Sequence, residues 1–260
     1  MQIISWNVNS VNSRLQHLVK LLKEEKPDVV LLQELKCLSE KFPFIEIEEL
    51  GYNIAGVYQK SYNGVAILSK HPMDDINYAM PDNEADEQSR YIDCLICSDT
   101  PFRVASAYVP NGQEVGSDKY QYKLGFYDKL IALYQTYLDQ GEDVVIGGDF
   151  NVANLDIDVY DVESSRGKIC FEINERKKLR QFINLGLYDS FRLLYPETKQ
   201  FTWWDYRGSG FTHDKGLRID YIFASSKMAD RIKDSKVLTD FRALEKPSDH
   251  APVALLLNEK

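Results

Sequence analysis

The sequence predicts an α/β fold in which helices cover β-sheets, and three observations lead to this class. Short apolar runs typical of buried strands recur along the whole chain. Segments with helical spacing lie between them. The 260 residues contain no repeat, low-complexity segment or obvious linker. We therefore expect residues 1–260 to form a single α/β domain with a large core.

The strand predictions rest on runs rich in Val, Ile, Leu and aromatic residues that end at polar or turn-forming residues. Such runs are typical of strands buried on both faces. The predicted strands are "IISW" (3–6), "DVVLLQ" (28–33), "GVAILS" (64–69), "FRVASAYV" (102–109), "DVVIGGD" (143–149), "IDYIFAS" (219–225) and "APVALLL" (251–257).

Three segments between these strands predict helices. The first contains Leu15, Leu18, Val19 and Leu22 at helical spacing. The segment "FYDKLIALYQTYLDQG" stops at Gly141, and "ERKKLRQFINLG" stops at a glycine in the same way. The basic "ERKKLR" part is either a solvated helix face or a local cationic cluster.

The net charge of −9 argues against a non-specific binder of polyanions. Net charge does not describe its distribution, and acidic residues that bind a metal are partly neutralised by the cation. Cys94 and Cys97 form a C-x-x-C, but "YIDCLICS" is typical of a strand, where side chains three apart point to opposite faces. We expect reduced thiols and no zinc or redox pair.

The N-terminal "MQIISWNVN" has no basic segment and no small-residue cleavage site. No apolar run approaches the roughly 20 residues needed to span a bilayer. We expect a cytoplasmic protein without membrane contact.

Polar residues repeatedly mark the ends of the predicted strands. A single Asn or Asp at such a place usually caps a turn. Taken together, they gather carboxylates, amides, a tyrosine hydroxyl and an imidazole. These residues are Asn7, Glu34, Tyr108, Asn111, Asp149, Asn151, Asp220, Asp249 and His250.

Asp220 is the hardest of these to explain as a turn residue. It lies inside an apolar strand between Ile219 and Tyr221, and a buried carboxylate needs a partner. His250 is the natural one, because a carboxylate fixes the tautomer and orientation of an imidazole that it binds. The other histidines lie in a helix, before a turn proline and in a glycine-rich loop.

The donor types indicate a hard cation. Mg²⁺ takes one or two carboxylates and completes its shell with water and substrate phosphate. Asparagine amides and a tyrosine hydroxyl can donate to phosphate oxygens, which suits metal-assisted phosphodiester cleavage. The glycine fingerprints of Rossmann and P-loop enzymes are absent.

Six motifs in order resemble the exonuclease III family of apurinic/apyrimidinic endonucleases, within the endonuclease/exonuclease/phosphatase group. They are "WNVNS", "LLQE", "YVPNG", "GGDFN", "GLRIDYI" and "EKPSDHAPV", and the resemblance runs from residue 2 to residue 256. It implies a four-layered α/β sandwich of the deoxyribonuclease I type, with two mixed β-sheets packed face to face between helices. The resemblance also implies a Mg²⁺- or Mn²⁺-dependent DNA repair enzyme, and we expect a monomer because nothing in the sequence indicates an interface. Such an enzyme incises duplex DNA 5′ to abasic sites, leaves a 3′-hydroxyl, and trims or cleans 3′ ends.

The resemblance also assigns roles near the cation. Glu34 is expected to be the principal metal ligand, with Asn7 beside it and Asp249 as a further contributor. Asp149 is expected to orient or deprotonate the attacking water. A pair formed by His250 and Asp220 remains the alternative base.

Further roles concern the substrate. Tyr108 is expected to donate to the phosphate or the leaving oxygen, and Asn151 and Asn111 to contact phosphate oxygens. His250, supported by Asp220, is expected to donate to the phosphate.

An abasic-site pocket should be small and apolar. By motif position, Trp203, Leu217 and Ile219 would line it, although ordinary core packing explains them equally well. The leucine at 217 leaves more room than the aromatic residue of some relatives. Basic residues expected to contact the DNA backbone are Arg90, Lys119, Lys168, Lys215 and Arg218.

Two other readings remain open. A phosphatase or phosphodiesterase of the same group with a non-DNA substrate would share the metal site and differ at its periphery. A catalytically silent DNA-binding relative would be expected to lose some of Glu34, Asp149, Asp220 or His250, and all are present.

Overall fold

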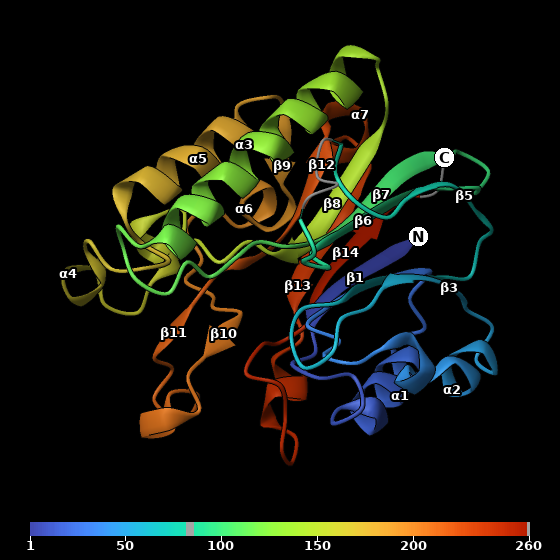
Figure 1. Cartoon of the computed structure of the whole chain (residues 1–260), viewed down its shortest axis with the longest axis horizontal. Coiled ribbons are helices and arrows are strands. Elements are labelled where there is room, and N and C mark those ends of the chain that lie inside the picture. Colours follow the sequence, from blue (N-terminus) through green and yellow to red (C-terminus); the bar gives the residue numbers. More distant parts are fainter. Residues whose placement is uncertain (82–85, 259–260) are drawn as a thin grey trace.

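The computed structural model describes residues 1–81 and 86–258, and two six-stranded β-sheets dominate it (Figure 1). The first sheet has the order β13 (Ile232–Val237), β14 (Val253–Leu257), β1 (Gln2–Asn7), β2 (Val29–Gln33), β4 (Val65–Ser69) and β3 (Asn53–Val57). The second has the order β5 (Met73–Asn77), β6 (Tyr91–Ile96), β7 (Phe102–Tyr108), β8 (Val144–Asp149), β12 (Asp220–Ser225) and β9 (Leu187–Asp189).

Both sheets are mixed in the same way. In the first sheet β1 and β2 run parallel, in the second β7 and β8 do, and the neighbouring pairs are antiparallel. A parallel pair needs a crossover, and each is joined through a helix. The helices are α1 (Leu15–Glu24), α2 (Phe44–Glu48), α3 (Asp118–Asp139), α4 (Val162–Ser165), α5 (Ile173–Ile183), α6 (Ser190–Leu194) and α7 (Ser226–Ala229).

The remaining elements are short. Strands β10 (Trp203–Trp204) and β11 (Gly216–Leu217) form a separate two-stranded sheet beside the sandwich (Figure 1). Isolated bridges connect Trp203 with His250 and Val159 with Leu217, so this small sheet is attached to the end of the main sandwich. The 3₁₀ turns are η1 (Ser39–Lys41), η2 (Asp156–Asp158), η3 (Arg207–Ser209) and η4 (Thr239–Ala243).

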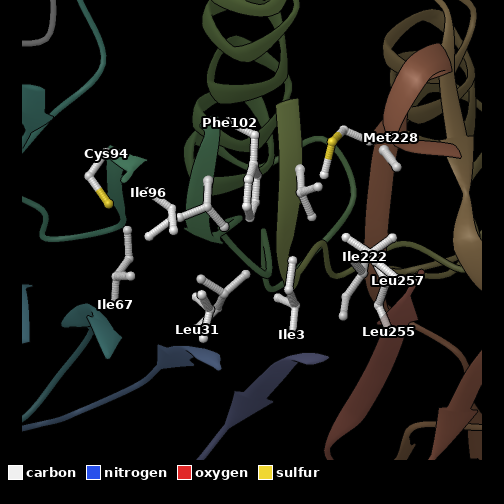
Figure 2. Close-up of a cluster of buried hydrophobic side chains, with 14 of the residues drawn as sticks. Ile3, Leu31, Ile67, Cys94, Ile96, Phe102, Ile222, Met228, Leu255 and Leu257 are labelled. Atoms are coloured by element: carbon white, nitrogen blue, oxygen red, sulfur yellow. The ribbon is translucent and has the colours of Figure 1, made fainter. Parts of the chain in front are cut away.

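The two sheets pack face to face over one apolar core. Figure 2 shows Ile3, Leu31 and Ile67 of the first sheet turned toward Cys94 and Ile222 of the second. Each of these side chains is at most 1% exposed. Their burial is the main free-energy gain that holds the layers together, because it removes apolar surface from water.

Helices cover the outer faces. In α1 the side chains of Leu18, Leu21 and Leu22 are buried against the first sheet. In α3 the residues Tyr127, Leu130 and Tyr134 follow helical spacing and pack against the second sheet, together with α5. The predicted four-layered α/β sandwich is confirmed.

Cys94 illustrates the alternation within β6. Its side chain is buried in the core between the sheets, whereas Cys97, just after the strand, is exposed. All four cysteines are free in this structure. Within residues 1–81 and 86–258, no helix is long and apolar enough to span a bilayer.

Candidate active site

Strand ends from both sheets meet at one end of the sandwich. Asn7 closes β1 and pairs in register with Gln33, the residue before Glu34. On the second sheet Asp149 closes β8, where its neighbours in register are Tyr108 and Asp220. Because β12 runs antiparallel to β8, a residue at its start lies beside a residue at the end of β8. The motifs are therefore adjacent in space.

The backbone supports this convergence at two acidic positions. Glu34 has φ 55°, a left-handed conformation that costs a non-glycine residue about 1–2 kcal/mol. Such strain persists where function or packing demands it. In the "GGD" motif, a Cβ at Gly148 would lie 1.9 Å from the carbonyl oxygen of Ala107, so glycine is needed for β8 to reach Asp149.

Asn7 links the carboxylates of the two sheets. Its Nδ2 donates to Glu34 Oε1 at 2.9 Å and to Asp149 Oδ2 at 3.0 Å. Its Oδ1 accepts the backbone N–H of Asn9 at 3.0 Å. In this orientation Asn7 presents nitrogen to both carboxylates and holds them near one another. Its role as a metal ligand stays a prediction.

His250 forms the pair that the sequence predicted with Asp220. Nδ1 lies 2.9 Å from Asp220 Oδ2, and the Thr202 hydroxyl donates to the same oxygen at 2.6 Å. A carboxylate at Nδ1 fixes the proton on that nitrogen and orients the ring. Nε2 then faces Asp149, with its Oδ2 at 3.7 Å. The pairing is confirmed, and its catalytic role stays a prediction.

The charges of this cluster perturb one another. Burial, followed by the charges of Asp220 and Glu34, raises the pKa of Asp149 to about 8 against the opposing effect of His250. Burial alone would lower the pKa of His250, but Asp220 and Asp149 raise it to about 10. Burial would likewise raise the pKa of Glu34, but Lys36, Asn7 and Tyr108 hold it below its ordinary value.

The donor set fits a divalent cation. Among the described residues, Glu34, Asp149 and His250 form the group whose carboxylate oxygens and ring nitrogen lie within 4.8 Å of one another. The carboxylates are the candidate metal ligands, because an imidazole whose pKa is raised to about 10 keeps its proton. Two carboxylates suit Mg²⁺ or Mn²⁺. Lys36 Nζ contacts Glu34 Oε2 at 2.6 Å. The ammonium group of Lys36 therefore balances part of the charge of Glu34 before a metal ion binds.

Asp249 lies on the rim of the cluster. It accepts hydrogen bonds from Asn9 Nδ2 at 2.8 Å and from the indole of Trp203 at 3.0 Å. Burial would raise its pKa, but His250 and these two donors hold it below the ordinary value. The carboxylate therefore stays charged and also fixes the position of Trp203. Its contribution to a metal site stays a prediction.

The predicted phosphate contacts form another part of the rim. Asn111 Nδ2 donates to Asn151 Oδ1 at 3.0 Å, and Asn151 Nδ2 donates to the carbonyl of Val109 at 2.9 Å. Asp149 Oδ1 accepts the backbone N–H of Asn151 at 2.9 Å. Tyr108 also borders the cluster, and burial raises the pKa of its hydroxyl well above the ordinary value, so it remains a proton donor.

A cavity of about 540 Å³ opens within this rim. The predicted Trp203, Leu217 and Ile219 line it, together with the acidic cluster. The sequence analysis missed part of the apolar wall, because the segment before α5 carries no periodic signal. The missed lining residues include Ile169, Cys170 and Phe171.

The basic residues fall into different places. Arg90 and Lys119 line a second groove of about 830 Å³, which shares Glu34, Tyr108 and Asn111 with the first. Lys168 lines the first cavity. Lys215 lies with its Nζ 5.8 Å from the ring centroid of Tyr160. Contact of these residues with DNA stays a prediction.

Arg218 was wrongly predicted to contact DNA. Its side chain is 1% exposed, with Nε 2.7 Å from Asp158 Oδ1 and Nη2 2.8 Å from Asp189 Oδ2. A guanidinium engaged in this way is structural. In "ERKKLR", Arg176 is paired with Asp156 and Lys178 with Asp128, which supports the helix-face alternative.

A sandwich of two mixed sheets with this cluster at one end defines a phosphodiester hydrolase that depends on a divalent cation. The chain belongs to the endonuclease/exonuclease/phosphatase family, whose model matches residues 4–250, and within it to the exonuclease III type.

Three relatives support this assignment. Exodeoxyribonuclease III of Haemophilus influenzae is 36% identical over 264 residues, which cover 97% of this chain and 98% of that protein. A Neisseria 3′ phosphatase, NExo, solved with a product DNA hairpin, has a TM-score of 0.96 and 39% identity, with both chains fully covered. An AP endonuclease from Archaeoglobus fulgidus has a TM-score of 0.94 and 34% identity, again with both chains fully covered.

Proposed function

We propose that this nuclease repairs duplex DNA by hydrolysing the phosphodiester 5′ to abasic sites, which leaves a 3′-hydroxyl, and by removing nucleotides and blocking groups from 3′ ends. The observation that carries the proposal is the cavity in which the Glu34–Asp149–His250 cluster adjoins an apolar wall. The relatives act as exonuclease, 3′ phosphatase and AP endonuclease, which are variants of one phosphate chemistry.

Glu34, with Asn7 and Asp249 nearby, would hold Mg²⁺ or Mn²⁺. When bound, such a cation supplies Lewis-acid polarisation of a phosphoryl oxygen. Asp149 then accepts the proton of the attacking water. Its raised pKa favours this role, because a base is most effective when its pKa is near the working pH.

The His250–Asp220 pair is the alternative base. The raised pKa of His250 favours a different task, since a protonated imidazole donates from Nε2 to a phosphate oxygen. Asn151 and Asn111 donate to further phosphate oxygens, and Tyr108 donates to the oxygen that leaves. These donors act on negative charge that grows in the transition state.

The apolar wall accounts for the substrate. An abasic nucleotide flipped from the helix exposes a sugar without a base, and Trp203, Leu217 and Ile219 offer that sugar a dry surface. The groove with Arg90 and Lys119 would follow the DNA backbone. We extend the proposal to a single domain of residues 1–260 that works as a monomer in the cytoplasm.

Labelled duplexes test this function. One carries an internal abasic analogue, one a recessed 3′-hydroxyl end and one a 3′-phosphate, and each is incubated with the protein and Mg²⁺ with or without a chelator. We expect a metal-dependent cut 5′ to the lesion and metal-dependent processing of the 3′ ends. Activity on the 3′ ends alone would remove the abasic-site assignment. Inactivity on all three would favour a non-DNA phosphate ester or a silent relative.

A further inference from the structure

A buried ion pair lies directly beneath the two asparagines of the phosphate rim. Lys123 projects from α3 and is 0% exposed. Its Nζ donates to the carbonyl oxygens of Asn151 at 2.7 Å and Asn111 at 3.1 Å, and to Glu175 Oε2 at 2.5 Å. A lysine ammonium has three protons, and these three acceptors use all of them.

Glu175 extends the connection to a third segment. Its other oxygen accepts the backbone N–H of Glu172 at 2.9 Å, which forms the N-terminal cap of α5. Glu172 follows Cys170 and Phe171, which line the cavity. The Lys123–Glu175 pair therefore joins the loop after β7, the loop after β8 and the start of α5.

The backbone at Asn151 requires such support. Its φ of 51° lies in the left-handed region, which turns the peptide carbonyl away from the direction of the strand. Lys123 binds this carbonyl, and the Asn151 side chain in turn accepts the hydrogen bond from Asn111. One ammonium group thus binds the backbone carbonyls of both asparagines, and their side-chain amides are joined to each other. The orientation of both side chains therefore depends on Lys123.

A buried ion pair is weak evidence for stability. Removing two charges from water is expensive, and a buried ion pair can often be replaced by apolar residues without loss of stability. Methionine side chains could fill the same space, but they could not donate to the carbonyls of Asn111 and Asn151.

We infer that Lys123, held by Glu175, is a positioning residue that aligns Asn111 and Asn151 for phosphate binding in the transition state. This inference rests on the proposed function, because it assigns those asparagines to the scissile phosphate. Lys123 does not touch the substrate itself. Its loss should affect the rate of cleavage more than the affinity for DNA, because neither Lys123 nor Glu175 lines the groove with Arg90 and Lys119.

The double variant Lys123→Met/Glu175→Met tests the inference. We expect urea unfolding to show that the double variant recovers most of the stability lost by Lys123→Met alone. In single-turnover cleavage of the abasic duplex, we expect the double variant to remain about 10- to 100-fold slower than wild type, the scale of a small misplacement of catalytic groups. Its dissociation constant for the uncleaved duplex should change no more than about twofold.

Arg103→Met is the matched control. Arg103 is also buried and paired, with Nη1 2.6 Å from Asp93, but it lies at the start of β7, the end opposite to Tyr108. We expect this variant to lose stability and to keep the wild-type rate per folded molecule. If the double variant does not fold, Lys123→Met at low temperature, normalised to its folded fraction, carries the same expectation.

A double variant that is stable and cleaves at the wild-type rate would overturn the inference and leave the proposed function intact. A loss of rate matched by Arg103→Met would also overturn it, because any buried pair would then have the same effect. A wild-type protein that cleaves no DNA would overturn the proposed function, and the inference with it.

Discussion

Two clusters of buried charged residues differ in how their charges are balanced. Behind the cavity wall, Asp158 contacts Arg218 at 2.7 Å and Arg192 at 2.5 Å, and Arg218 also contacts Asp189. The two carboxylates meet two guanidiniums. Burial would raise the pKa of Asp158, but the arginines hold it below its ordinary value.

In the candidate active site, the carboxylates are only partly balanced by positive charges. Its carboxylates at Glu34, Asp149 and Asp220 face Lys36 and His250, and the pKa of Asp149 rises to about 8. In the first cluster each carboxylate contacts a guanidinium, whereas here three carboxyl groups share one ammonium group and one imidazole. The difference teaches that burial of charge alone does not mark function, and that incompletely balanced buried charge in a cavity identifies a candidate site.

The largest effect is expected from Asp149→Asn, which removes the proton acceptor and preserves the shape of the side chain. The rate of cleavage should fall by about 10²–10⁴-fold. Single-turnover kinetics on the abasic duplex measure the rate, and a gel-shift titration measures DNA affinity, which should be nearly unchanged. Normal turnover would remove Asp149 from the mechanism and leave the His250–Asp220 pair as the base.

His250→Asn is expected to have the next largest effect. The variant loses the Nε2 donor, and loss of one donor to a developing negative charge costs about 10²–10³ in rate. The same kinetic assay measures it. An effect of only a few-fold would mean that His250 and its bond to Asp220 are structural.

A substitution in the cluster of Asp158, Asp189, Arg192 and Arg218 should lower stability and leave the cleavage rate nearly unchanged. Arg218→Met removes the buried guanidinium that Asp189 contacts and leaves Asp158 with Arg192 as its only cationic partner, so it should lower the free energy of unfolding by about 3–5 kcal/mol. Urea unfolding measures this loss. The folded fraction should cleave DNA at a rate within a few-fold of wild type. A loss of cleavage as large as that of Asp149→Asn would show that the two clusters do not differ in function.

The smallest effect is expected at the groove lined by Arg90 and Lys119. Lys119 is exposed, so Lys119→Ala should weaken binding modestly and reduce the salt dependence of log K by about one phosphate contact. Lys177→Ala is the control, because Lys177 is exposed on α5 and lines neither groove. Equal salt dependence in both variants and wild type would exclude Lys119 from the interface.

The sequence predicted the central strands because they are buried on both faces and therefore form continuous apolar runs. It missed β3, β5, β9 and β13, which are the edge strands of the two large sheets and mix exposed and buried residues. It also missed the two-residue strands β10 and β11. The Asp220–His250 pair was predictable because a carboxylate between apolar residues demanded a partner.

The role of Arg218 could not be predicted in this way. It lies between apolar residues, as Asp220 does, but its partner Asp158 is 60 residues away and carries no motif that would identify it. The role of Lys123 was equally hidden, since its three acceptors come from three separate segments. Interactions of this kind, between charged residues far apart in the sequence, can be identified only from the structure.

Thermal unfolding over a series of Mg²⁺ concentrations, with wild type and Glu34→Gln compared, tests the central claim most directly. If unbalanced carboxylates form a divalent-cation site, Mg²⁺ binds the folded state and raises the melting temperature of wild type in a saturable way. The variant, which lacks one charge of the cluster, should show a much smaller rise. An equal rise in both proteins, or none in wild type, would contradict the claim.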